Sequence, residues 1–393
     1  MAVLLAVIVF AGLLLARAAR VPQPAPARGA RPRPHPGTAT APVMPQPGKE
    51  SQAVLPDIAE APASSALDAM DQPELLYGFQ LLNVDDLPAA QRADLGAQLS
   101  TIALPPRSTR LLMSPEFLAD TATREFTDLV MHEPLLAGKV IGRVNSAFYA
   151  LSSPIVSVSH AVTYLGLNAI RTMALQFTLE QAFASEDAQL QEFHARLFDA
   201  GTVAAELCTL LAPRLGISDV SIASTQAVLS FLGDFAMPSL LPQDAAIKNW
   251  PLGLLDRTCN EQFAMGTNAG VIGALMMEEW DLPQTIRDDV RDINLILVAP
   301  CNAPPSRRQA RLALSFICAR IGERISLGRV QNPEQIKLLG SRQAEHHHLQ
   351  SYLRYSPLQQ LPRVLQETGV RLAIARLIAA SERSRSMPVP EAD

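Results

Sequence analysis

Aromatic residues are scarce in this 393-residue chain, at 5% of the sequence with two tryptophans. Sheets are usually enriched in aromatic and β-branched side chains, whereas this chain is rich in Ala and Leu, which favour helices. No stretch shows the sustained alternation of apolar and polar residues that is typical of a half-buried strand. The sequence therefore predicts an all-α protein, and its 48% hydrophobic content is enough to build packed cores.

An excess of positive charge is also missing. The formal net charge is −5 and the isoelectric point is near 5.9. A general nucleic-acid-binding surface needs a basic face to neutralise phosphates, so we expect no nucleic-acid partner. Arg307, Arg308 and Arg311 form one local basic patch, and Asp281, Asp288, Asp289 and Asp292 form an acidic one. Both are interpreted as solvated helix faces.

The chain lacks the common catalytic motifs: a Gly-rich phosphate loop, G-x-S-x-G and H-E-x-x-H. Its four cysteines, Cys208, Cys259, Cys301 and Cys318, form no C-x-x-C pair and lie in or beside apolar helical patterns. We expect them to be small buried residues in a reducing compartment.

Histidine is infrequent, with seven residues in the chain. His194 is expected to be a partly exposed residue of a helix surface. His346, His347 and His348 are adjacent, so on a helix they would face different directions and make a poor metal site.

Residues 2–16 are continuously apolar, and the first charge is Arg17. The run is shorter than the roughly 20 residues of a typical span, but a snorkelling Arg17 lets it just cross. Arginines follow the run and none precedes it, which predicts an anchor over residues 1–20 with the rest of the chain in the cytoplasm. A cleaved signal peptide is one alternative, because Ala16-Arg17-Ala18 loosely fits a cleavage site, and a peripheral apolar tail is the other.

Residues 21–64 are rich in Pro and Ala and lack apolar periodicity, so they predict a disordered, extended linker. Residues 65–96 regain helical character. They are interpreted as a helical lead-in that either packs on the main domain or serves as a dimerising arm. A homodimer is therefore possible.

The motif V-N-S-A-F-Y (residues 144–149) lies between two apolar helical patterns. Pro154 cannot occupy a helix interior, so the first helix is predicted to end near the end of the motif. Ser157 is expected to cap the next helix, Gly166 to close it and Asn168 to cap a third. The stretch predicts a helix-turn-helix corner.

Further helical patterns follow this corner along the chain. They cover residues 168–184, 188–212, 220–236, 252–265, 268–280, 283–297, 306–327, 333–353 and 357–385, after earlier ones at 116–131 and 134–149.

The corner, followed by Pro154-Ile155, Ala161-Val162 and Leu165-Gly166, closely resembles the signature of the HDOD family, the HD-related output domain of bacterial signalling proteins. The resemblance covers residues 97–298, leaves a C-terminal helical extension over 299–393, and implies a multi-helix bundle related to the HD phosphohydrolase fold. The signature residues, with a structural or binding role, are Asn145, Ser146, Phe148, Tyr149, Pro154, Leu165 and Gly166. Asn145 is expected to cap or cross-link helix ends.

HD phosphohydrolases hold divalent metals with a His, a His-Asp pair and further His and Asp ligands, so the resemblance also implies where such ligands would lie. By position they fall at Asp199, at Gly233 and Asp234, at Ala269, and near Asn294. Imidazole is missing from each of these positions. We therefore expect neither a catalytic residue nor a metal or other cofactor.

The preferred interpretation is a non-catalytic regulatory module, tethered through residues 2–16 to the inner membrane of a bacterium. It would bind a signalling protein or a small effector. One alternative is a degenerate metal-dependent phosphohydrolase that acts on a nucleotide, with Mg²⁺ or Mn²⁺ held by the carboxylates of Asp199, Asp234 and Glu261. A purely structural scaffold is the other.

Overall fold

The computed structural model describes residues 73–102, 104–105, 127, 130–131, 134–145, 151, 153–336 and 344–386. The predicted anchor and Pro-rich linker, and Ser146, Phe148 and Tyr149 of the signature, lie outside the described residues. Every regular element in the described part is a helix, and no strand occurs there, which confirms the predicted all-α class.

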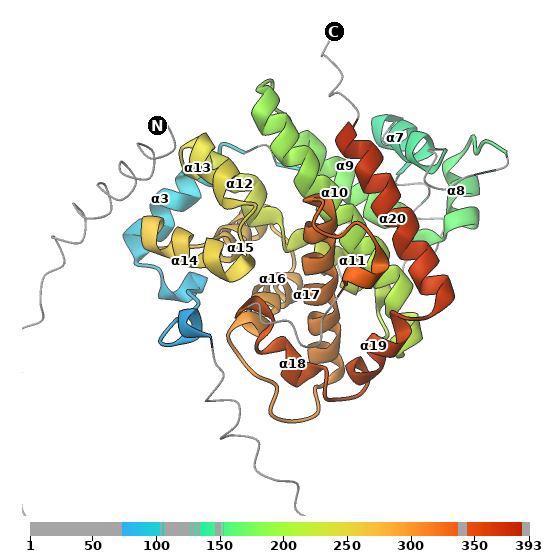
Figure 1. Cartoon of the computed structure of the whole chain (residues 1–393). Coiled ribbons are helices and arrows are strands. Elements are labelled where there is room, and N and C mark those ends of the chain that lie inside the picture. Colours follow the sequence, from blue (N-terminus) through green and yellow to red (C-terminus); the bar gives the residue numbers. More distant parts are fainter. Residues whose placement is uncertain are drawn as a thin grey trace, which may run out of the picture. The chain divides into compact units, whose positions relative to one another are not determined.

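The helices follow one another in the order shown in Figure 1. The first are η1 (Glu74–Leu76), η2 (Val84–Asp86), α3 (Ala89–Leu99), α7 (Pro134–Val144), α8 (Val158–Leu165), α9 (Leu167–Ala182), α10 (Ala188–Leu211), η3 (Pro213–Leu215), α11 (Val220–Leu229), α12 (Leu232–Leu240) and α13 (Gln243–Asn249). The remainder are α14 (Leu254–Met265), α15 (Ala269–Glu279), α16 (Gln284–Ile293), η4 (Asn294–Leu297), α17 (Arg307–Ser326), η5 (Pro333–Gln335), η6 (Ala344–His346), α18 (Leu349–Tyr352), η7 (Leu358–Gln360), α19 (Leu361–Val364) and α20 (Thr368–Ser386).

The main core forms around α10 and α17, which pack along each other. Leu197 and Leu207 of α10 and Ile317 of α17 are fully buried. The helices α11, α12, α15, α16 and α20 also contribute buried side chains to this core. The helices α17 and α20 lie after residue 298, in the C-terminal extension, and their side chains are buried in the main core. The extension and the region of the HDOD resemblance therefore share one core.

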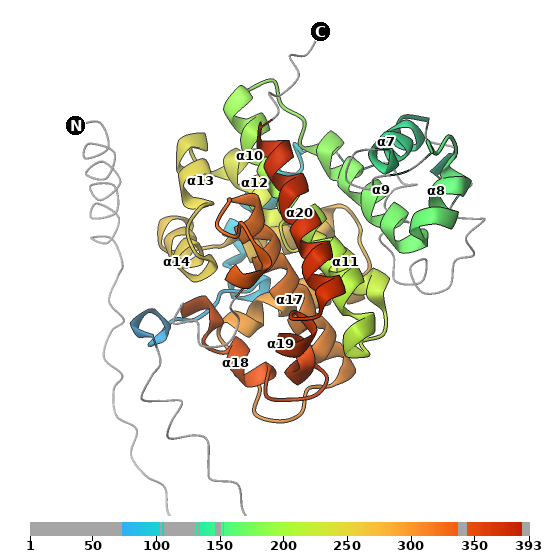
Figure 2. The same ribbon diagram turned by 45° about the vertical axis from the view of Figure 1, so that its right-hand side comes forward.

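A second, smaller core lies between α7, α8 and the first half of α9, to one side of the main core in Figure 2. Val140 and Val144 of α7 and Ala161 of α8 are buried in it. The two cores share α9, which places Ile170 in the smaller core and Leu179 in the main one. The helix α9 therefore joins the signature region to the rest of the fold.

The signature corner, residues 145 and 153–166 of the described chain, is held together by one amide. Asn145 Nδ2 donates to the carbonyl oxygens of Ile141 (2.9 Å) and Ile155 (2.7 Å), and Asn145 Oδ1 accepts from the Ile155 amide at 2.8 Å. Ser157 caps α8 by accepting from the His160 amide. Gly166 has φ +84° and separates α8 from α9.

Two details of the predicted corner are wrong. The helix α7 ends at Val144, several residues earlier than predicted, because Asn145 already bonds across to the segment before α8. Asn168 does not cap α9, since the helix begins at Leu167, and its Oδ1 instead accepts from the Ser221 hydroxyl of α11. The Asn168 contact thus ties the smaller core to the main one.

The predicted helix over residues 220–236 is two helices, α11 and α12, which are separated at Ser230 and Phe231. The run Val220–Leu240 is long and apolar enough to cross a membrane by length and composition, but most of it is buried inside the protein. Burial on all sides explains the missed break, because such a stretch has no polar face whose periodicity could reveal a change of direction. The patterns over 333–353 and 357–385 are likewise divided into several short helices and α20.

The lead-in packs on the turn between α14 and α15. Gln262 Oε1 accepts from the Leu82 amide at 3.0 Å, and Gln262 Nε2 donates to the Gln80 carbonyl at 2.9 Å. Asn268 Nδ2 donates to the Leu82 carbonyl at 3.0 Å, and Gln91 Nε2 donates to the Met265 carbonyl at 2.8 Å. These bonds favour the packed lead-in over the free arm.

Candidate functional site

The positions that the HD resemblance marks lie close together with one exception. Asp234 on α12, Ala269 at the start of α15 and Asn294 after α16 line one pocket, which we call the central pocket. Arg257 of α14 and Arg320 of α17 line it as well, and Leu81 of the lead-in belongs to its wall. The pocket is narrow and partly open to solvent, with a cavity volume of about 10 Å³ for the centre of a water molecule.

Gly233 lies where α12 and α15 touch through their backbones. A Cβ atom built on Gly233 would be 1.7 Å from the Ala269 carbonyl oxygen and 2.9 Å from the Gly273 amide nitrogen. Any side chain here would force the helices apart, so the space that an imidazole would need is already filled by α15.

Asp234 faces a guanidinium group. Arg257 Nε lies 3.4 Å from Asp234 Oδ1, and the two side chains are 1% and 7% exposed. Arg257 also donates to Glu323 of α17, from Nη1 at 2.7 Å and from Nη2 at 3.2 Å. Arg320 also pairs with Glu323. We call this group of side chains, Asp234, Arg257, Glu261, Arg320 and Glu323, the ion cluster.

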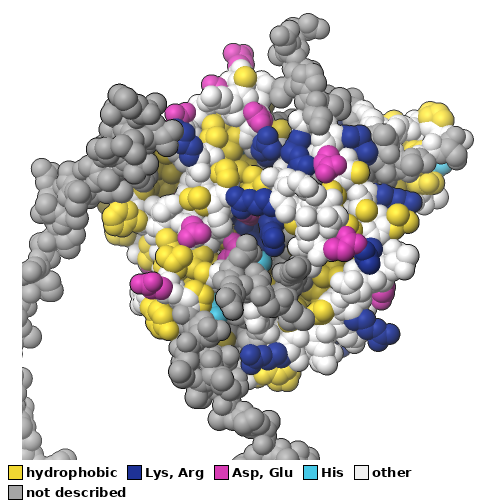
Figure 3. All heavy atoms as spheres, in the orientation of Figure 1, with side chains coloured by type: hydrophobic (Ala, Val, Ile, Leu, Met, Phe, Trp, Pro, Cys, Tyr) yellow, Lys and Arg dark blue, Asp and Glu magenta, His cyan; other side chains and the backbone are white. Residues whose placement is uncertain are grey.

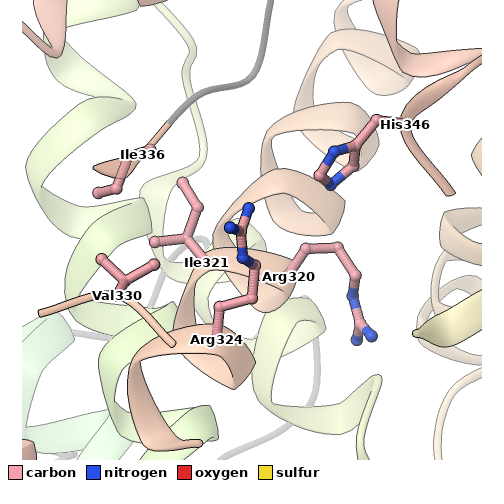
Figure 4. A pocket seen from close by; sticks show the side chains of 6 residues that line it. All are labelled: Arg320, Ile321, Arg324, Val330, Ile336 and His346. Atoms are coloured by element: carbon pink, nitrogen blue, oxygen red, sulfur yellow. The ribbon is translucent and has the colours of Figure 1, made fainter. Parts of the chain in front are cut away.

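Aromatic rings pack against both guanidinium groups of the ion cluster. Arg257 lies over the Trp250 ring at 4.6 Å from its centroid, and Arg320 lies over Phe231 at 5.5 Å. A second, mostly apolar pocket adjoins Arg320, and in Figure 4 the Arg320 guanidinium points away from Ile321, Val330 and Ile336 of that pocket. Cation–π contacts of desolvated guanidinium groups add stability at such a site.

Burial and the neighbouring guanidinium groups together set the protonation of the carboxyl groups. Desolvation raises the pKa of Asp234, with Arg257 opposing the shift. Desolvation, with a smaller contribution from Asp234, raises the pKa of Glu261 to about 8. For Glu323, burial alone would raise the pKa, but Arg257 and Arg320 outweigh it and hold the pKa below its ordinary value. At neutral pH, therefore, Glu261 is mainly uncharged and Glu323 is ionised.

Glu261 completes the start of α15. Its Oε2 accepts from the Ala269 amide at 2.8 Å, and its Oε1 accepts from Asn249 Nδ2 at 3.1 Å. Asn268 Oδ1 accepts from the Val271 amide at 3.0 Å and caps the same helix. The side chain of Glu261 is thus occupied by structural hydrogen bonds.

Asp199 is not part of the central pocket. It lies on α10 and accepts a hydrogen bond from the Ser381 hydroxyl of α20. Burial raises its pKa, and the charges that oppose the shift come from Arg143 and Arg385, not from the ion cluster. The carboxylate set Asp199, Asp234 and Glu261 therefore does not converge.

The residues of the central pocket do not fit a divalent metal ion. A catalytic metal needs several donor groups that converge and leave one position open. Gly233 and Ala269 offer no side-chain donor, Asp234 already faces Arg257, and Glu261 bonds to the helix start. Within the described ranges, no group of three or more His, Cys, Asp or Glu side chains is arranged to hold a metal ion.

Two other residues that were predicted at the surface, His194 and Asp289, are buried instead. His194 is 6% exposed and packs among Phe183, Phe193 and Phe235, with Nε2 3.2 Å from the Phe235 carbonyl oxygen. His346 is also buried. Asp289 is 6% exposed, because its carboxylate accepts from Arg308 at 2.6 Å and from Arg311 at 2.9 Å. The acidic and basic patches thus neutralise each other between α16 and α17.

Arg257, Arg320 and Glu323 are residues of the candidate site that sequence reasoning missed. A signal for two of them is present in α17, where Arg320 and Glu323 stand three residues apart in the apolar run from Ala313 to Ile325. Charged residues at helical spacing in such a run indicate a buried ion pair. Arg257 has no comparable signal, because α14 is polar on several sides.

The model of the HDOD domain matches residues 107–294 of the sequence. The chain carries an HDOD domain. The matched residues lie within the range 97–298 expected from the signature, and the domain has the all-helical architecture described above. Arg320 and Glu323, which close the ion cluster, lie beyond the matched residues and belong to the C-terminal extension.

Solved structures give matches of low sequence identity. An HDOD domain protein of unknown function from Geobacter sulfurreducens is 16% identical, over 76% of this chain and 99% of that chain, with a TM-score of 0.49. A candidate phosphohydrolase from Shewanella amazonensis is 17% identical, over 73% and 98%, with a TM-score of 0.46. A candidate signal transduction protein from Marinobacter aquaeolei is 18% identical, over 76% and 69%, with a TM-score of 0.44. No curated protein matches the sequence.

Proposed function

We propose that this HDOD protein is a non-catalytic regulatory module that binds a small effector or a partner protein and relays its presence. The observation that carries the proposal is the pairing of Asp234 with Arg257 inside the central pocket. A guanidinium group takes the place and the charge of a cation beside Asp234, the one acidic HD position that lies in the central pocket.

The closed contact at Gly233 supports the same proposal. Restoring an imidazole there would require separation of α12 from α15, because the Ala269 carbonyl occupies the space of a Cβ atom. The departure from an HD site therefore involves the packing of two helices as well as the loss of ligands.

The lead-in gives the module a route for relaying a signal. Leu81 belongs to the wall of the central pocket, and the neighbouring residues Gln80 and Leu82 are tied to Gln262 and Asn268. A conformational change in the pocket would therefore alter the contacts of residues 80–82, which belong to the lead-in. Tethering to the inner membrane of a bacterium through residues 2–16, with the helical domain in the cytoplasm, is proposed from the sequence pattern alone.

Metal analysis combined with hydrolysis assays tests the proposal. The full-length chain is purified in detergent, its bound metals are measured, and cyclic dinucleotides, alarmones and a chromogenic phosphodiester are offered with Mg²⁺ or Mn²⁺. We expect no stoichiometric metal and no turnover above that of an Asp234→Asn variant. Turnover by the wild-type chain that disappears in Asp234→Asn and is kept in an Asp199→Asn variant would instead establish a phosphohydrolase at the central pocket.

A further inference from the structure

The central pocket is lined by more hydrogen-bond donors than acceptors. Arg257 and Arg320 are 1% and 5% exposed, and within the described part of the chain neither Nε atom has a hydrogen-bond partner. The nearest carboxylate atom to the first is Asp234 Oδ1, at 3.4 Å. A buried guanidinium N–H group without an acceptor costs free energy. A ligand oxygen that enters the pocket can accept these hydrogen bonds and so gains binding free energy.

Further donors come from the start of α15 and from Asn294. The Ala269 and Val271 amides are bonded to Glu261 and Asn268, but the Gly270 amide, which lies between them, has no acceptor among the described residues. The half-exposed Asn294 carboxamide likewise has no side-chain hydrogen bond within the described ranges, and it lies beside Gly270. The positive end of the α15 dipole is directed at the same place.

The charges next to the pocket are two guanidinium groups and two carboxylates, those of Asp234 and Glu323, and only the first carboxylate lies in the pocket wall. Glu323 accepts hydrogen bonds from both guanidinium groups and is not among the residues that line the pocket. Figure 1 shows α12, α14, α15 and α17, which supply most of these groups, arranged around the same part of the fold, and Asn294 of η4 follows directly after α16.

We infer that the central pocket binds the phosphate group of a small ligand, through Arg257, Arg320, Asn294 and the Gly270 amide. Several N–H donors that converge from different elements match the oxygens of a phosphate, and arginine is well suited to contact them. The inference rests on the proposed non-catalytic role and names the chemical class of the effector. The phosphate belongs either to free inorganic phosphate or to a phosphorylated small molecule.

The test is a titration of the full-length chain in detergent with inorganic phosphate, at constant ionic strength and with EDTA present. Calorimetry or ³¹P line broadening gives the dissociation constant. We expect Arg320→Met and Asn294→Ala to weaken binding by about tenfold or more, because each removes a hydrogen bond to a charged ligand.

Gly270→Ala keeps the test independent of the ion cluster. Its methyl group would be 2.7 Å from Asn294 Nδ2 and 3.0 Å from Asn268 Oδ1, so it displaces the Asn294 carboxamide, while alanine suits a helix. We expect about tenfold weaker phosphate binding with unchanged helicity. Gly96→Ala is the matched control, since a Cβ at Gly96 of α3 meets nothing within 4 Å, and it should bind phosphate as the wild-type chain does.

Titrations with a nucleoside monophosphate and with glycerol phosphate then separate the sources of the phosphate. Tighter binding than that of inorganic phosphate assigns the pocket to a phosphorylated molecule, and equal or weaker binding assigns it to the free ion. The inference is overturned if phosphate does not bind, or if Gly270→Ala, Asn294→Ala and Arg320→Met all bind it like wild type. Because EDTA is present throughout, this failure is distinct from metal-dependent turnover, which would overturn the proposed function instead.

Discussion

The signature corner and the ion cluster both depend on hydrogen-bonded polar side chains, but Asn145 of the corner is exposed, the ion cluster is buried, and the two sites are built from different parts of the chain. The corner satisfies Asn145 with the backbone of Ile141 and Ile155, at most ten residues away in sequence. The ion cluster joins Asp234, Arg257 and Glu323. Arg257 and Glu323 alone are 66 residues apart in the sequence. Polar groups that are close in sequence stabilise a local turn. Polar groups that are distant in sequence meet only in the folded protein, where their opposite charges have to be paired.

The difference extends to what surrounds each site. The corner belongs to the smaller core, whose helices α7 and α8 have one apolar face each. The ion cluster lies between helices of the main core that are buried on most sides. Figure 3 shows Lys and Arg side chains gathered near the middle of one face of the protein, with acidic side chains next to them. We therefore expect changes in the ion cluster to affect the whole fold and changes in the corner to have smaller effects.

Gly233→Ala should have the largest effect. Its Cβ atom would overlap the Ala269 carbonyl, and backbone atoms cannot give way as a side chain does. We expect a loss of stability above about 4 kcal/mol, or no folded protein, as for severe overpacking of a core. Circular dichroism during urea unfolding measures it. Gly369→Ala, which has open space around the added methyl group, should stay within about 1 kcal/mol of wild type.

Arg257→Met should cost about 3–5 kcal/mol, because it leaves Asp234 buried without its cation. Adding Asp234→Asn to the same chain should recover part of that loss. The surface pair of Arg92 and Glu278, with side chains 42% and 46% exposed, provides the comparison. Arg92→Met should cost less than about 1 kcal/mol in the same urea titration. Equal costs at the two arginines would show that the ion cluster is not the special site of this comparison.

Glu261→Gln should change how stability depends on pH. The pKa of Glu261 is raised from 4.5 to about 8, so the folded protein keeps its proton while the unfolded chain loses it. The stability due to this group is complete below pH 4.5 and is lost as the pH rises toward 8, at about 1.4 kcal/mol per unit. The variant should therefore gain stability relative to wild type over this window, as measured by urea unfolding at several pH values. A constant difference would mean that the Glu261 carboxyl is already ionised in the fold.

Asn145→Ala should have the smallest effect, about 1–2 kcal/mol, because it removes hydrogen bonds at a partly exposed site. The loss should be local. The Ile155 amide donates a hydrogen bond to Asn145 Oδ1, so its hydrogen exchange should become faster in the variant, while the exchange of amides in α17 should not change. Asn145→Asp is the matched variant, since it keeps the acceptor for Ile155 and should protect that amide better than alanine does.

The sequence predicted the helices that have one polar face and a clear cap. For α10, the predicted range 188–212 compares with Ala188–Leu211, and the Ser157 cap of α8 was also correct. The break between α11 and α12 was missed because both helices are buried almost all round. His194 and Asp289 were wrongly expected at the surface, since a pattern along one helix does not show what packs over it from another.

The sequence by itself determined the helical class, the signature corner and the absence of imidazole from the HD positions, because each depends on residue type or on neighbours a few residues away. Only the tertiary structure decided that α15 closes against Gly233, that Arg257 faces Asp234 and that Asp199 lies apart. These facts depend on how helices distant in sequence pack, and the burial that shifts the pKa of Glu261 exists only after that packing.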